Sequence, residues 1–196
     1  MLNNIKLTLE YDGTNYYGWQ KQKGFKTIQG EIEEAIELVT KEHCEVIGSS
    51  RTDAGVHARG FVANFKTNSK VPPNKFREAL NVKLPNDIVI TKSEQVDEEF
   101  HARYYAKGKT YEYYILNSDV PSALMRNQMY HYKYDLDVEA MKISSKPINL
   151  TWSGTLIPFS CKATNAPYAL QSFVANIPSK GTSLLISLSI ACLAPS

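Results

Sequence analysis

The residues with the clearest chemical potential lie within residues 48–60, a run that begins and ends with glycine. Asp53 has Arg51 two positions before it, and His57 and Arg59 follow it. A guanidinium beside a carboxylate favours the ionised form, so Asp53 is expected to stay charged. A charged carboxylate suits a nucleophile or a charge stabiliser, and it does not suit a proton donor near neutral pH. A structural ion pair or turn cap is the alternative that these residues leave open.

The segments around this run must position it, and their patterns indicate strands and a helix. Alternating apolar residues along 5–11 predict a strand. Apolar spacing along 27–41 predicts a helix with Thr27 as its N-cap, and its glutamates are expected to form a solvated face. Short strands are predicted at 45–49 and 61–65. The run between these two strands carries Asp53 and is called the acidic loop. It would therefore join two strands at a sheet edge.

Further along the chain, residues 72–81 predict a second helix and residues 88–95 another strand. The resulting β-α-β-β-α-β order is that of a ferredoxin-like unit. The expected fold class is α+β, with a ferredoxin-like or RRM-like antiparallel sheet and helices on one face. A strand around Tyr111–Ile115 and a helix from Asp137 to about residue 146 are also predicted. Fold alone indicates no function.

Composition places the chain among ordinary globular proteins, with 196 residues and a net charge of +2. Three cysteines form neither a CxxC pair nor a disulfide framework, which favours a reducing, cytoplasmic setting. The histidines are scattered without metal-ligand spacing, so no metal is expected. No signal peptide is expected, and the most apolar run, residues 184–194, is too short to cross a membrane.

Two groups of aromatic residues have alternative interpretations. Residues 14–22 interleave aromatic side chains, amides and lysine, which suits stacking on bases and contact with phosphates. The same loop could instead have Trp19 packed under the domain, and this interpretation is slightly favoured. Tyr111 and Tyr113 share one face of a predicted strand, where tyrosines belong more often to the core than to a binding site.

Four strings along the chain resemble the tRNA pseudouridine synthase A family. They are Tyr-Asp-Gly-Thr-x-x-x-Gly-Trp-Gln at 11–20, Arg-Thr-Asp-Ala-Gly-Val-His-Ala at 51–58, Phe-His-Ala-Arg at 100–103 and Lys-x-Lys-Thr-Tyr-x-Tyr at 107–113. The resemblance implies a pseudouridine synthase fold with Asp53 as the essential catalytic residue and Tyr111 in contact with the target uracil. It also implies a cytoplasmic homodimer that modifies uridines of the tRNA anticodon stem-loop, at positions 38 to 40.

The implied reaction breaks the bond from C1′ to N1 of uridine, turns the uracil and joins C1′ to C5, with no cofactor, metal or redox step. Asp53 would attack the ring or the sugar, or assist elimination to a glycal, and the sequence does not choose among these routes. A stacked uridine must first leave its helix. Arg51 would fill the vacated space or hold the phosphate of the flipped nucleotide. The expected substrate-binding residues are Tyr111, Arg51, His57 and Arg59, and the histidines His57 and His101 could equally order their loops.

The resemblance stops near residue 146. The later Gly-Thr-His-Asp-Phe and Gly-Asn-Gly-Phe types of motif are not found, and residues 147–196 contain no acid. This composition predicts a frame change or a divergent replacement near residue 146. The expected domains are a catalytic half at 1–105, the start of a second α/β half at 106–146, left incomplete, and an atypical tail at 147–196.

Three other interpretations are considered for the same residues. A non-catalytic tRNA-binding or RNA-binding module would use the aromatic loop and the sheet without altering the RNA, and an inactive truncated form would result from the missing motifs. A glycoside-cleaving enzyme would need a second carboxylate near Asp53, and the sequence offers none there. The first two alternatives stay open.

Overall fold

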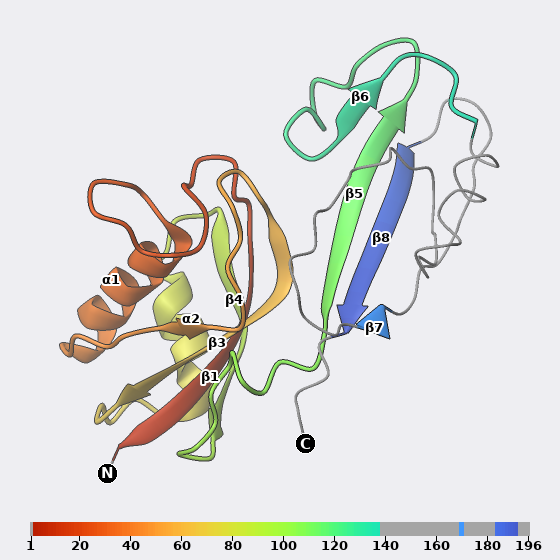
Figure 1. The fold of residues 1–196 in the computed structure, drawn as a ribbon. Coiled ribbons are helices and arrows are strands. Elements are labelled where there is room, and N and C mark those ends of the chain that lie inside the picture. Colours follow the sequence, from red (N-terminus) through yellow and green to blue (C-terminus); the bar gives the residue numbers. More distant parts are fainter. Residues whose placement is uncertain (1, 138–168, 171–182, 192–196) are drawn as a thin grey trace. The chain divides into compact units, whose positions relative to one another are not determined.

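The structure is a computed structural model that describes residues 2–137, 169–170 and 183–191. The chain divides into two compact units, Met1–Ala106 and Lys107–Ser196. Each unit has its own sheet, and the described strands give each sheet four members (Figure 1). Among the residues of these ranges, no helix is long and apolar enough to cross a membrane.

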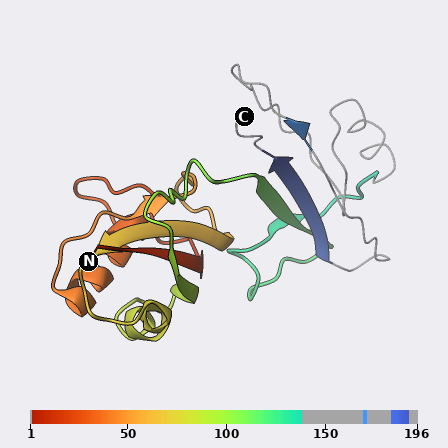
Figure 2. The same cartoon turned by 90° about the horizontal axis from the view of Figure 1, so that it is seen from below.

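The first unit has the ferredoxin-like arrangement that the sequence predicts. Its elements are β1 (Asn3–Tyr11), α1 (Ile28–Thr40), β2 (Ile47–Gly48), β3 (Ala58–Thr67), a 3-10 turn (Pro73–Lys75), α2 (Phe76–Asn81) and β4 (Ile88–Val96). The strand order is β2-β3-β1-β4, and each neighbouring pair is antiparallel. Both α1 and α2 cover the same face of the sheet (Figures 1 and 2). The predicted α+β class is therefore confirmed.

The core lies between this sheet and the two helices. Every second residue of β1 points into it, and Ile5 and Leu7 stand opposite Phe65 and Ala63 of β3. The largest fully buried side chains include Ile5, Leu7, Leu9, Phe65, Ile28, Ile32, Ile36, Phe76 and Leu80. Burial of each such side chain stabilises the fold by about 1.5–3 kcal/mol. A register shift of one residue would turn the apolar set to solvent, so the core fixes the strand pairing.

The start of α1 is closed by the chain that precedes it. Its first four amides all donate hydrogen bonds, at 3.0 to 3.3 Å. Two of the acceptors are the hydroxyl and the carbonyl of Thr27, and the other two are the carbonyls of Gly18 and Trp19. The predicted N-cap is therefore confirmed, and the loop before the helix is bound to its first turn.

Several elements differ from their predicted extents. The strand predicted at 61–65 is longer, since β3 spans Ala58–Thr67. The strand predicted at 45–49 is only β2, because the amide of Val46 donates to the carboxylate of Glu33 at 3.1 Å. The helix predicted at 72–81 begins as a 3-10 turn and continues as α2. Pro72 lies outside it, in an extended conformation (ψ 137°), because another proline follows it.

The second unit is built around β5 (Lys109–Asn117), which confirms the strand predicted there. The other strands are β6 (Tyr130–Tyr132), β7 (Ala169–Leu170) and β8 (Ser183–Ala191), in the order β6-β5-β8-β7. β5 pairs with β8 antiparallel and with β6 parallel. The helix predicted from Asp137, and all of the predicted atypical tail except β7 and β8, lie outside the described residues. The division of the second half at residue 146 stays a prediction.

Candidate active site

The acidic loop joins β2 to β3 at the edge of the first sheet, as the sequence predicts (Figure 1). Within it the amide of Val56 donates to the carbonyl of Asp53 at 3.2 Å and closes a tight turn. The third residue of this turn, Gly55, has a φ of 79°, a conformation that favours glycine. The side chain of Asp53 is exposed at the start of the turn.

The main chain on both sides of Asp53 is held by the segment that follows β1. The amide of Trp19 donates to the carbonyl of Thr52 at 3.1 Å. The amide of Gly55 donates to the carbonyl of Tyr16, also at 3.1 Å. These two bonds flank Asp53, so its backbone is fixed before and after the residue. The first two strings of the family resemblance are thus partners in space.

Two glycines let the two segments touch. A Cβ atom on Gly18 would overlap the carbonyl oxygen of Thr52, and one on Gly13 would overlap the carbonyl oxygen of Val56. Gly18 also has a φ of 82°. Because both obstacles are backbone atoms, no side-chain rotation could relieve them. The sequence marks these positions only as turn residues, and their close approach to the loop comes from the tertiary structure.

Tyr11 is the last residue of β1, and its side chain contacts the loop. Its hydroxyl lies 2.9 Å from the hydroxyl of Thr52, and the residue is only 4% exposed. Burial raises the pKa of Tyr11 to about 12, against the opposing effect of the bond to Thr52, so the phenol stays protonated near neutral pH. The rings of Trp19 and Phe61 lie against it, with centroids 6.3 and 5.8 Å away. Reasoning from periodicity assigns Tyr11 to the core and misses this bond.

Trp19 is packed under the domain, as the favoured interpretation of its loop predicts. It is 3% exposed and stacks on Phe61 at a centroid distance of 4.2 Å. A Cβ atom on Gly48 would lie 2.5 Å from its ring, so β2 needs a glycine there. The exposed aromatic residues of this region are Tyr17 and Phe25, whose rings lie 4.4 Å apart.

His57 contributes to the order of the loop. Its Nδ1 atom lies 3.0 Å from Oδ1 of Asp12, which also accepts a hydrogen bond from the amide of Thr14 at 2.9 Å. Burial acts to raise the pKa of Asp12, but the hydrogen bonds from Thr14 and the nearby His57 outweigh it and lower that pKa. The Asp-Gly-Thr sequence was the available signal for this turn. A contact of His57 with RNA stays a prediction.

The remaining predicted residues have different surroundings. Arg51 and Arg59 are exposed, as Asp53 is, and the ionising effect of Arg51 on Asp53 stays a prediction. Tyr111 is half-buried on β5, with Nζ of Lys109 at 4.7 Å from its ring centroid. Tyr111 belongs to the second unit, so its contact with uracil also stays a prediction.

The sequence also singles out His101 and Tyr113. Nδ1 of His101 is buried and has no hydrogen-bond partner in the part of the chain that the structure describes. Its ring stacks on that of Tyr104 at 4.1 Å. Tyr113, on the same face of β5 as Tyr111, is 55% exposed, so the core preference does not hold for it.

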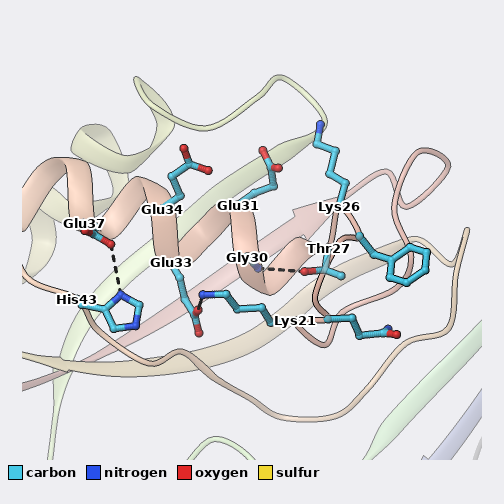
Figure 3. Close-up of a pocket in the computed structure, with 11 residues that line it drawn as sticks. Lys21, Lys26, Thr27, Gly30, Glu31, Glu33, Glu34, Glu37 and His43 are labelled. Carbon is cyan, nitrogen blue, oxygen red and sulfur yellow. Dashed lines mark hydrogen bonds and ion pairs between the residues drawn. The ribbon is translucent and has the colours of Figure 1, made fainter.

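A charged hollow of about 270 Å³ lies beside α1 (Figure 3). Glu33, expected on a solvated face, is instead 5% exposed there and accepts hydrogen bonds from Lys21 at 2.8 Å and Gln29 at 2.9 Å. Its third partner is the amide of Val46. These bonds make Glu33 a structural group. Across the described ranges, no group of three or more His, Cys, Asp or Glu residues could hold a metal ion.

Known proteins similar to this chain belong to the family that its sequence strings indicate. The family model described as tRNA pseudouridine synthase matches residues 8–105. tRNA pseudouridine synthase A 2 of Clostridium perfringens is 62% identical over 145 residues, which are 74% of this chain and 59% of the relative. tRNA pseudouridine synthase A of Acetivibrio thermocellus is 58% identical over 141 residues, 72% of this chain and 58% of that protein. The chain thus spans about six tenths of the length of these curated relatives. It belongs to the tRNA pseudouridine synthase family, which confirms the resemblance read from its sequence.

Proposed function

We propose that the whole protein isomerises uridine to pseudouridine in tRNA and that Asp53 is its catalytic carboxylate. The observation that carries the proposal is the backbone of Asp53, which is held by hydrogen bonds on both sides while its side chain is exposed. A reaction on a flipped nucleotide requires a reactive group at a fixed position that a bulky ligand can reach. Membership of the tRNA pseudouridine synthase family supports the same reaction.

The reaction changes no oxidation state and releases nothing except the proton of C5. The bond from C1′ to N1 breaks, the uracil turns, and C1′ bonds to C5, which then loses its proton while N1 gains one. Asp53 assists by adding to C6 of the ring or to C1′ of the sugar, or by promoting elimination to a glycal. In each route the carboxylate is free again at the end.

The proposed substrate is the anticodon stem-loop of tRNA, at positions 38 to 40, and the proposed assembly is a cytoplasmic homodimer. Removing a stacked uridine from its helix costs a few kcal/mol, which contacts with the RNA must offset. Arg51 and Arg59 are exposed on the loop or just after it and supply guanidinium groups suited to phosphate. The further proposed contact, Tyr111, would stack on the uracil.

Replacing the carboxylate by an amide tests the proposal. Asp53→Asn is expected to abolish tritium release from tRNA labelled at C5 of uridine, while the affinity for that tRNA in a gel-shift assay stays within about threefold. Asp97→Asn is the matched control, because Asp97 is also exposed in the first unit but lies beyond β4. An Asp53→Asn protein that still releases tritium would refute the role of Asp53.

A non-catalytic RNA-binding module is the second candidate. The exposed pair of Tyr17 and Phe25, whose rings are tilted against each other, favours it, because such rings can stack on unpaired bases. A single-turnover experiment with excess protein separates the two candidates. A binder would retain the labelled RNA and release no tritium, whereas the synthase would release one tritium per modified uridine.

A further inference from the structure

We propose that Tyr11 is a positioning residue for Asp53, whose buried hydroxyl fixes Thr52 and thereby the carboxylate that follows it in the chain. This inference rests on the proposed role of Asp53. It assigns to Tyr11 an effect on the rate of the chemical step, exerted through Thr52 and without contact with the RNA.

Tyr11 spans the base of the acidic loop. Its backbone pairs with Ala58, at the end of the loop, and its hydroxyl reaches Thr52, near the start. The pairing of β1 with β3 is irregular between Leu9 and Tyr11. Such bulges change the direction of a side chain and occur often beside active sites. One residue therefore contacts the loop directly before Asp53 and again where the chain enters β3.

Thr52 is engaged at two polar groups. Its hydroxyl bonds to Tyr11, and its carbonyl accepts from the amide of Trp19 at 3.1 Å. Gly18 packs against the same carbonyl. A threonine hydroxyl that loses its partner can rotate to another rotamer or bond to nearby backbone. Loss of the Tyr11 hydroxyl would therefore loosen the peptide unit that directly precedes Asp53.

The structure offers a matched control in Tyr16. Both tyrosines are buried, and the hydroxyl of each bonds to one side chain, which for Tyr16 is Asp87 at 2.5 Å. Asp87 lies just before β4 and outside the loop. The main-chain carbonyl of Tyr16 accepts from the amide of Gly55 in the loop, and a phenylalanine would keep that bond. A general effect of removing a buried hydroxyl would appear in both variants, whereas a positioning effect would appear only at Tyr11.

The experiment compares Tyr11→Phe, Tyr16→Phe, Thr52→Val and Thr52→Ser in the full chain. Tyr11→Phe and Thr52→Val are each expected to lower kcat for tritium release about 10- to 100-fold with KM within about threefold, because a misplaced group loses rate more than binding. Thr52→Ser keeps the hydroxyl and is expected to stay within about threefold of the parent. The double variant should be no slower than either single one, since both remove the same bond.

Equal losses of kcat in Tyr11→Phe and Tyr16→Phe would overturn the proposal, as would an unchanged kcat in Tyr11→Phe. Circular dichroism checks that each variant is folded. If the parent chain releases no tritium, the proposed function fails, and hydrogen exchange of the Trp19 amide then decides the inference about Tyr11. That amide bonds to Thr52 and should exchange about tenfold faster in Tyr11→Phe than in Tyr16→Phe. Equal exchange rates would overturn the positioning role.

Discussion

The acidic loop and the hollow beside α1 both gather charged groups, but their hydrogen bonds go to different places. In the loop, the bonds hold the main chain around Asp53, and the side chain is exposed. In the hollow, the bonds go to the side chain of Glu33, which is buried by its partners (Figure 3). A concave, charged surface is therefore not sufficient to indicate a site. A fixed backbone with an exposed reactive group is the better indication.

We therefore expect substitutions in the two regions to have different effects, one mainly on activity and the other mainly on stability. A change at the loop should lower turnover more than it lowers the free energy of unfolding. A change at the hollow should do the reverse. Residues matched in type but placed in different surroundings allow each half of this statement to be tested.

Among changes that leave Asp53 itself in place, the largest effect is expected from Gly18→Ala. A methyl group there meets the carbonyl of Thr52, and the φ of 82° adds strain. Displacement of the backbone beside Asp53 should lower kcat about 100-fold. Gly24 also has a φ of 82°, but a Cβ atom there would meet nothing within 4 Å. If Gly24→Ala slows tritium release as much, backbone strain and not the loop contact is the cause.

Glu33→Gln should affect stability and leave activity almost intact. The charged partner Lys21 loses its buried carboxylate, and hydrogen bonds to charged groups contribute about 1.5–3 kcal/mol. We expect the free energy of unfolding in urea to fall by about 2 kcal/mol, with tritium release per folded molecule within about twofold. Glu34→Gln, at an exposed position on the same helix, should change neither. A Glu33→Gln protein that is stable but inactive would contradict the contrast between the two regions.

Arg51→Ala should weaken both turnover and capture of the flipped nucleotide. We expect kcat/KM to fall about tenfold, because a guanidinium can bind phosphate with two parallel bonds. Arg77→Ala is the control, since Arg77 is an exposed residue of α2 paired with Glu78. Kinetics for Arg51→Ala that match those of Arg77→Ala would count against the role of Arg51.

The smallest expected effect concerns acid stability. The pKa of Asp12 is lowered in the folded protein, so its contribution to stability is present above the ordinary pKa of an aspartate and is lost as pH falls through the lowered value. Urea midpoints measured from pH 6 to pH 3 should therefore fall slightly less in Asp12→Asn than in the parent chain. Identical pH dependence in the two proteins would show that the bonds of the Asp12 carboxylate with Thr14 and His57 add nothing to acid stability.

Much of the first unit could be predicted from the sequence because its core follows simple periods. The alternation in β1 and the helical spacing in α1 correspond directly to buried faces. The short extent of β2 could not be predicted in this way. It depends on Glu33, thirteen residues before Val46, which takes the amide that a longer strand would use. Local sequence patterns do not reveal this long-range hydrogen bond.

The loop that carries Asp53 could be predicted from the sequence, but the contacts that support this loop could not. The residue types around Asp53 indicated chemistry, and glycine punctuation indicated a turn. The bond from Tyr11 to Thr52 was missed because strand periodicity gives an inward-facing tyrosine no role except packing. The contact of Gly18 with Thr52 depends on tertiary structure. In the sequence, the two residues were connected only because both lie in strings that resemble the same family.

The closed start of α1 has a consequence for how nucleic acid can be held. A helix N-terminus is electropositive and often serves as a ready seat for an anion. In this protein the carbonyls of Gly18 and Trp19, together with Thr27, already occupy the first-turn amides. The first turn of α1 therefore has no spare amide for a polyanion, and lysine and arginine side chains are expected to bind it instead. When lysine and arginine side chains bind phosphates, counterions are released from the RNA, so the affinity for RNA should decline steeply as ionic strength rises.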